Sequence, residues 1–155
     1  KNNGIIAGEG AAFFVLSKQK AENAYGIYIG GKTFLQPDST EEIQNQILSF
    51  LKSNNISLSE IDVLVSGING RKQNDEPLKE LNNGLFKEQT ILAYKQLCGE
   101  YMTSSAFAFW LVSKILKAQT IPPVTFLENR KRAPKNILLY TNYKHNHSLM
   151  LFKAC

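Results

Sequence analysis

Cysteine and histidine are scarce in this 155-residue sequence, which contains two of each. Cys98 and Cys155 show no paired spacing, a pattern that gives no support to a disulfide framework and fits a reducing cytoplasm. No stretch approaches the run of about 20 apolar residues that a transmembrane helix needs, and no signal-peptide pattern occurs. We therefore expect a single domain over residues 1–155, located in the cytoplasm and not in a membrane.

Dense charge is also rare, although the net charge is +5. The basic residues are dispersed, which gives no reason to expect nucleic-acid binding. Arg130-Lys131-Arg132, with Lys135 close by, is the one dense basic cluster. A solvated loop is the simpler interpretation of this cluster, and a docking patch for an acidic partner is the alternative.

Motifs for cofactors and metals are missing as well. The closely spaced glycines lack the P-loop spacing and its lysine, so we expect no cofactor. His145 and His147 would share one face of a strand, but no third zinc ligand is near them, so we expect solvated turn residues and no metal site. Cys98 has no adjacent histidine and is interpreted as an inert, buried thiol.

The segment around which the sequence is organised is residues 103–120, TSSAFAFWLVSKILKAQT, followed by Pro122 and Pro123. Residues 106–112 are all apolar and would cover every side of a helix, which predicts a central core helix without a solvent face. A chain of 155 residues cannot easily enclose such a helix alone. We expect part of its cover to come from another domain or subunit, and the chain itself to be a piece of a longer polypeptide.

The remaining pattern alternates between strands and helices, which predicts an α/β layered domain with a mixed five-stranded sheet and helices on both faces. Ser39 and Glu42 fit a capping box, and the two last strands are expected to pair antiparallel. Asp75 is interpreted as the cap of a helix with a solvated first turn. The predicted strands are residues 11–16 (buried), 25–35, 63–66, 89–94, 136–141 and 147–153, and the predicted helices or helical turns are 18–24, 39–54, 57–62, 75–86 and 103–120.

Taken in order, these segments resemble the C-terminal half of β-ketoacyl-acyl-carrier-protein synthases, which are members of the thiolase superfamily. The resemblance covers nearly all of the chain, and it implies a thiolase-like half-domain with its central helix enclosed between two sheets. It also implies that the nucleophilic cysteine of the family lies in the other half, which this chain lacks. The matching sequences are Gly8-Glu9-Gly10-Ala11, LSEIDVLV at 58–65, Asn74-Asp75 with Phe86, and Lys95, Gly99 and Ile121-Pro122-Pro123 around the central helix.

The catalytic positions depart from the family pattern. The two family histidines fall on Gly67 and Glu100, and the glycine-rich loop near the C-terminus falls on residues that keep Asn146 but no glycine. Lys95 is the one charged site residue that is kept. The family histidines donate hydrogen bonds to developing negative charge, whereas glycine offers no donor and an ionised glutamate would repel an enolate. Losing one such donor typically lowers the rate by about 10²–10³.

We therefore expect a ketosynthase-like, non-catalytic subunit, similar to a chain-length factor, in fatty-acid or polyketide-type acyl-chain synthesis. Its partners would be an acyl carrier protein and an active ketosynthase or its own N-terminal half, in a dimer. One alternative is an active 3-oxoacyl-acyl-carrier-protein synthase, an acyltransferase whose cysteine lies in the missing half. Another is a scaffold that keeps the fold for protein association.

The central helix generates a prediction about association. The 155-residue chain in isolation should be a dimer, or should expose a large apolar patch that binds hydrophobic dyes. Size-exclusion chromatography with light scattering, combined with dye fluorescence, measures both properties. A monomer without dye-binding surface would show that the helix is enclosed by this chain alone.

Overall fold

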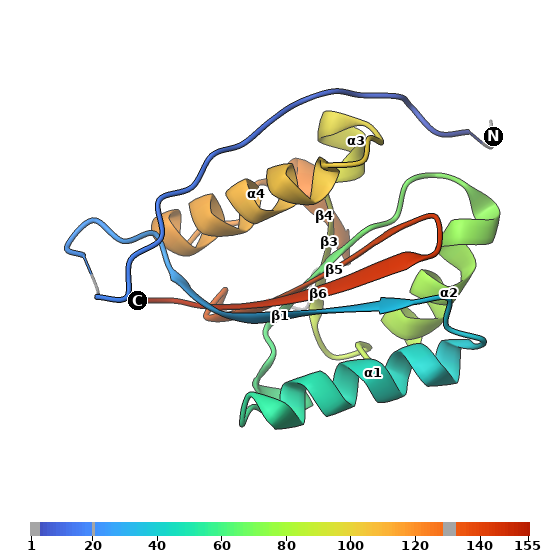
Figure 1. The fold of residues 1–155 in the computed structure, drawn as a ribbon, viewed down its shortest axis with the longest axis horizontal. Helices are drawn as coiled ribbons and strands as arrows, with labels where there is room; N and C mark the ends of the chain where they lie inside the picture. The colour runs from blue at the N-terminus through green and yellow to red at the C-terminus, as the bar shows by residue number, and fades with distance from the viewer. Residues whose placement is uncertain (1–3, 20, 129–132) are drawn as a thin grey trace.

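The fold is a mixed six-stranded sheet covered by helices on both faces (Figure 1), in a computed structural model that describes residues 4–19, 21–128 and 133–155. The order of strands across the sheet is β1-β6-β5-β2-β3-β4. The elements are β1 (Ile27–Leu35), α1 (Thr40–Ser53), η1 (Leu58–Glu60), β2 (Val63–Ser66), α2 (Lys72–Asn83), β3 (Thr90–Ala93), α3 (Lys95–Cys98), α4 (Ser104–Ala118), η2 (Pro123–Thr125), β4 (Phe126–Glu128), β5 (Asn136–Tyr143) and β6 (Asn146–Lys153).

The centre of the sheet is parallel, and its flanks are antiparallel. β2 pairs in parallel with β3 on one side and with β5 on the other. All four residues of β2 and of β3 are buried, as expected for strands covered on both faces. The predicted antiparallel pairing of the last two strands is confirmed by β5 and β6, and β1 pairs antiparallel with β6 at the sheet edge.

The first helical layer is formed by α1 and α2. Ser39 caps α1 by accepting a hydrogen bond from the N–H of Glu42, but the Glu42 carboxylate accepts from the N–H of Asp38, so the reciprocal half of the predicted capping box is displaced by one residue. α1 buries Ile43, Ile47, Phe50 and Leu51 against the sheet. Leu48, which the sequence pattern assigns to the same face, is 42% exposed.

The second layer contains α3 and α4, and α4 is the predicted central helix. It packs on residues of β2, β3, β5 and β6 that alternate with those facing α1 and α2. The prediction of a helix without a solvent face is correct only in part, because Trp110 is 44% exposed and Phe107 is half-buried. An N-terminal strap, defined as residues 5–16, runs across the outer side of α4 (Figure 1).

The strap corrects one strand prediction. Residues 11–16 were expected to form a buried strand, but they are in no strand, and Phe13 and Val15 are 95% and 100% exposed. These β-forming residues lack a neighbouring edge with which to pair, and only Phe14 packs inward, against Phe109.

The sheet was also expected to contain five strands, but it contains six. The additional strand is β4, which lies between α4 and β5 in the sequence. It has three residues and pairs only with β3, so it is too short to carry a periodic pattern. The basic cluster at residues 130–132 lies outside the described residues. Every helix within the described ranges is too short or too polar to cross a bilayer.

The start of α2 lies three residues before the predicted one. The helix begins at Lys72 and ends at Asn83, whereas the sequence pattern predicts residues 75–86. Asp75 is therefore inside the helix, and it is buried instead of capping a solvated first turn. Aspartate is favoured both as a helix cap and as a buried hydrogen-bond acceptor, so the sequence pattern alone does not distinguish these two roles of Asp75.

Tandem glycines in β1 interrupt the edge strand as the sequence predicts. The register with β6 shifts between Tyr28 and Gly30, which marks a β-bulge at this point. A side chain on Gly31 would lie 2.4 Å from the hydroxyl of Tyr28 and 3.2 Å from a carbonyl of β6. The glycine therefore makes room for the close packing of the bulged edge.

His147 is buried, which contradicts its interpretation as a solvated turn residue. Its Nδ1 lies 2.6 Å from the hydroxyl of Tyr140, and its ring stacks on Phe34. Burial, with a smaller contribution from His145, lowers the pKa of His147. Burial also raises the pKa of Tyr140, so the tyrosine keeps its proton and can donate it to the imidazole nitrogen.

Acidification should therefore destabilise the fold through His147. Because its folded-state pKa is lowered from the usual value near 6.5, the unfolded chain binds a proton more readily, and stability is lost as the pH falls through that value. In urea denaturation, His147→Gln should lose less stability than the wild type between neutral pH and about pH 5. His145→Gln changes an exposed turn residue that makes only the smaller contribution to the lowered pKa of His147, so it should keep most of the wild-type slope. Equal slopes in both variants would refute this assignment.

Candidate functional site

The carboxyl ends of the three parallel strands bring the candidate residues together. Gly67 directly follows β2, and Tyr94 and Lys95 directly follow β3. Ser66 is in register with Tyr140, so Gly67 lies beside Thr141 of β5. Ligand sites of open α/β sheets form outside such strand ends. Three of the four positions singled out in the sequence, Gly67, Lys95 and Glu100, thus meet in one place.

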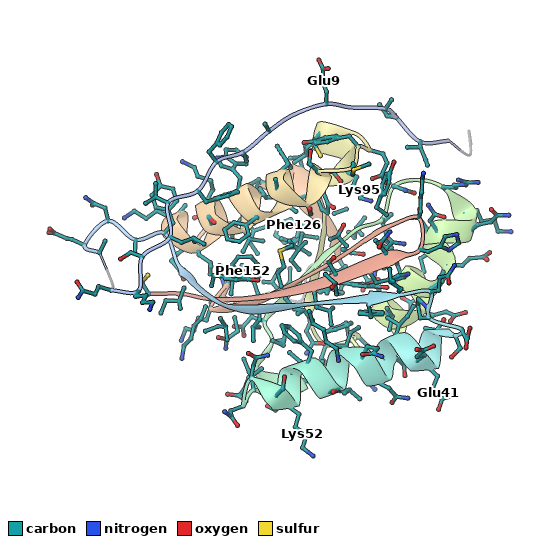
Figure 2. The ribbon with its side chains drawn as sticks, in the orientation of Figure 1. Glu9, Glu41, Lys52, Lys95, Phe126 and Phe152 are labelled. Atoms are coloured by element: carbon teal, nitrogen blue, oxygen red, sulfur yellow. The ribbon has the colours of Figure 1, made fainter. Side chains whose placement is uncertain are left out.

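An ion pair forms the centre of this site. Nζ of Lys95 lies 2.6 Å from Oε2 of Glu100 and donates a second hydrogen bond to the carbonyl of Asn142, at 3.1 Å. The Lys95 and Glu100 side chains are 2% and 10% exposed. Figure 2 shows Lys95 directed inward beneath α3. The pair links the ends of β3 and β5, and its charges neutralise each other away from water.

The loop after β2 completes the pair through Asn69, which the sequence patterns did not single out, and through Asp75, which they assign to a helix cap. The side-chain amide of Asn69 donates to Oε2 of Glu100 at 2.7 Å. The buried carboxylate of Asp75 accepts the backbone N–H groups of Asn69 and Gly70, at 3.0 and 2.9 Å. Asp75 thus holds the loop in the conformation that places Asn69 on the ion pair. A polar loop directly after a buried strand was the signal in the sequence that could have pointed to Asn69.

Two acceptor atoms of the site have no hydrogen-bond partner. Among the described residues, Oε1 of Glu100 and Oδ1 of Asn142 are buried without a hydrogen-bond partner. Such an atom destabilises a fold by roughly 1–3 kcal/mol. Two of the three N–H groups of the Lys95 ammonium are already bonded to protein oxygens. An acceptor-rich site of this kind is unsuited to stabilising an oxyanion, which needs free donors aimed at it.

Gly67 is tightly packed at the position where the resemblance places an imidazole. A Cβ on Gly67 would lie 3.1 Å from the Cα of Thr141 and 3.2 Å from Oδ1 of Asn142. The first of these contacts is with backbone, which cannot move aside without shifting β5. Asn142 therefore occupies space next to Gly67 that a side chain at position 67 would need.

Asn146, the fourth predicted position, takes no part in this network. It is exposed at the start of β6, in register with Tyr143 of β5 and Leu35 of β1. The residues expected to correspond to a glycine-rich loop instead form the tight β5–β6 hairpin, in which Lys144 has a φ of 54°. Lys144 therefore adopts the left-handed backbone conformation for which glycine is usually favoured.

Two further groups border the site. The buried hydroxyl of Tyr94 lies 2.9 Å from that of Thr141, and burial raises the pKa of Tyr94. Cys98 is half-buried, and burial likewise raises the pKa of its thiol. A raised thiol pKa disfavours the nucleophilic thiolate, which agrees with the interpretation of Cys98 as unreactive. Within the described residues, no group of three or more His, Cys, Asp or Glu side chains is arranged to hold a metal ion.

Phe109 of α4 belongs to an aromatic cluster and not to the ion-pair network. Its ring centroid lies 4.3 Å from that of Phe14, 5.6 Å from that of Tyr28 and 4.7 Å from that of Phe152. Phe109 thus joins the strap to β1 and β6 across α4.

The strap also contacts the backbone of the site. Glu100 donates its N–H to the carbonyl of Ile6 at 2.8 Å and accepts the N–H of Gly8 at 3.2 Å. A Cβ on Gly8 would lie 1.9 Å from the carbonyl oxygen of Cys98, so only glycine permits this approach.

Comparisons with known proteins identify the fold. No protein-family model and no curated protein matches the sequence. Solved structures do match. They include a type II polyketide-synthase acyl-carrier protein in complex with its ketosynthase, at 17% identity and a TM-score of 0.66, and the ishigamide ketosynthase/chain length factor, at 15% and 0.69. A third is the ketosynthase from module 1 of the bacillaene synthase of Bacillus amyloliquefaciens, at 14% and 0.64.

The fold is that of a thiolase-like half-domain. Each match covers 84% of this chain, but only 39%, 38% and 30% of the three matched chains. The chain therefore spans well under half the length of these ketosynthases. At such low identity the similarity establishes the architecture and leaves the chemistry to the residues of the site.

The ion pair generates a prediction about stability. Lys95→Met should lower the free energy of unfolding by about 3–5 kcal/mol, because it leaves the Glu100 carboxylate buried without its partner. The double variant Lys95→Met/Glu100→Leu should recover most of that loss. Lys72→Met, in the exposed pair with Glu76, is the matched control and should change stability by less than about 1 kcal/mol. Urea denaturation measures all three, and a double variant no more stable than Lys95→Met would contradict the prediction.

Proposed function

We propose that this chain is a ketosynthase-like, non-catalytic subunit, similar to a chain-length factor, in fatty-acid or polyketide-type acyl-chain synthesis. The observation that carries the proposal is the closed Lys95–Glu100 pair at the carboxyl ends of the parallel strands. In the ketosynthases that this chain resembles, two histidines at these positions would donate hydrogen bonds to an enolate. Here the corresponding positions hold a glycine packed against β5 and a buried carboxylate.

The electrostatic argument has two parts. An enolate oxygen beside Glu100 would lie next to a second negative charge in a buried site, where repulsion is weakly screened. Lys95 balances the charge of Glu100 at 2.6 Å, so the pair as a whole supplies no net positive charge to stabilise an enolate. The missing donors together should lower the rate of decarboxylation by more than the 10²–10³ expected for one donor, roughly 10⁴ or more.

The partners belong to the same proposal. The strap and α4 both carry exposed apolar side chains, among them those of Phe13, Val15, Leu16 and Trp110. A surface of this kind needs a cover. We propose that an active ketosynthase or the N-terminal half of the same polypeptide supplies it, in a dimer that works with an acyl carrier protein. One matched structure is a complex of an acyl-carrier protein with its ketosynthase, which supports this choice.

Decarboxylation of malonyl carrier protein tests the proposal. The full-length protein should release carbon dioxide at a rate near the uncatalysed background, alone or after Glu100→Gln substitution. Addition of an active ketosynthase should restore turnover, and the length of the acyl products should depend on the presence of this chain. The decisive control is the same mixture without this chain.

A robust rate from the protein alone that is lost on Glu100→Gln or Lys95→Met would favour the other candidate. The chain would then be half of an active synthase whose cysteine lies elsewhere in the polypeptide. The retained Lys95 is the structural observation on which that candidate rests. If carrier protein and ketosynthase both fail to bind, the scaffold alternative is left.

A further inference from the structure

The strap and the ion pair meet at a single residue, Glu100. Its backbone forms a short parallel bridge with Ala7, through the hydrogen bonds to Ile6 and Gly8. Its side chain forms the buried pair with Lys95. A movement of the strap therefore reaches the site through one peptide unit.

The strap packs tightly against the backbone that precedes Glu100. The Cα of Gly8 packs on the backbone of Cys98 and Gly99, where an added Cβ on Gly8 would lie 1.9 Å from a carbonyl oxygen. Gly99 has a φ of 74°, and a Cβ there would lie 2.8 Å from the Cα of Gly8. Two glycines facing each other at this distance fix the backbone of the following residue, Glu100.

The rest of the strap is weakly held. Among the described residues, none of the backbone groups of residues 11–16 forms a hydrogen bond, and Phe14 provides the aromatic contact to α4. Figure 2 shows Glu9 directed away from the body of the molecule at the middle of the strap. Segments with few buried contacts and unpaired backbone open at low free-energy cost.

One oxygen of the ion pair has no hydrogen-bond partner. Oε1 of Glu100 is buried without a partner although its other oxygen accepts from both Lys95 and Asn69. A carboxylate with one orphaned oxygen gains hydrogen bonds to water when it is released. The closed arrangement thus depends on the strap that fixes the Glu100 backbone.

We infer that the strap is a latch: residues 5–16 keep the Lys95–Glu100 pair closed, and displacement of the strap opens it. The covering subunit of the proposed function packs over the strap and keeps the latch closed, since the strap lies on the outer side of α4 (Figure 1). The inference rests on the proposed function for the identity of that cover. The coupling between strap and pair is a property of this chain alone.

The latch is tested by acetylating the lysines of the folded chain and then measuring the modification of Lys95 by mass spectrometry of its peptides. Gly8→Ala forces the strap from Cys98, and it should raise the acetylation rate of Lys95 by roughly tenfold or more, because reactivity follows the population of the opened form. Gly10→Ala, whose Cβ meets only the end of the Tyr101 side chain at 2.8 Å, should have a smaller effect. Gly4→Ala adds a Cβ in open space and is the matched control, with a wild-type rate.

Hydrogen exchange of β2 and β3 separates a local opening from unfolding. If those strands keep wild-type protection while Lys95 becomes reactive in the order Gly8, Gly10, Gly4, the latch is supported. An unchanged Lys95 rate in Gly8→Ala, equal rates in Gly8→Ala and Gly4→Ala, or loss of protection in β2 in step with Lys95 reactivity would each overturn it. None of these readouts requires enzymatic activity, so failure of the latch is distinct from failure of the proposed function.

Discussion

The buried contact between Lys95 and Glu100 is the interaction on which the arrangement of the site depends. The lysine follows β3, the carbonyl it binds belongs to β5, and the asparagine that supports the glutamate follows β2. One ammonium and one carboxylate therefore join the ends of three parallel strands. Taking two charges out of water is unfavourable, and the pair persists because each partner satisfies the other and both accept or donate further hydrogen bonds.

This bonding pattern is the physical basis of the proposed non-catalytic role. The scaffold still converges at the carboxyl ends of the parallel strands, where a ligand site would form. The polar groups of Lys95, Glu100 and Asn69, however, are directed at one another. Under the proposed function, these residues contribute to stability and not to turnover.

Much of the architecture could be predicted from periodicity. β2 was predicted with the correct bounds, α1 and α4 within one or two residues, and the final antiparallel pair was predicted as such. Each has a regular apolar pattern that depends on the segment itself. β4 and the strap at residues 11–16 were predicted incorrectly, because their conformations depend on which neighbour is available for pairing.

The candidate site was predictable only where the resemblance marked a position. Lys95, Glu100 and Gly67 were found in this way, whereas Asn69 and Asn142 were not, and Asp75 was matched without its role in holding the loop. The contribution of the latter three is geometric: a backbone carbonyl, a loop held by a buried carboxylate, and an amide turned toward the pair. Such roles arise from tertiary contacts between segments far apart in the chain, and no local spacing encodes them.

The two edges of the sheet lead to a different consequence. β4 offers only three residues, and β1 is bent by its bulge and carries Lys32 in its middle. Short or bulged edges with a charged side chain are poor templates for an incoming strand. Both edges of the sheet are therefore poorly suited to the addition of a strand. Exposed apolar side chains of the strap and of α4 lie on the helical layer, where a protein contact would pack on helices and would not extend the sheet.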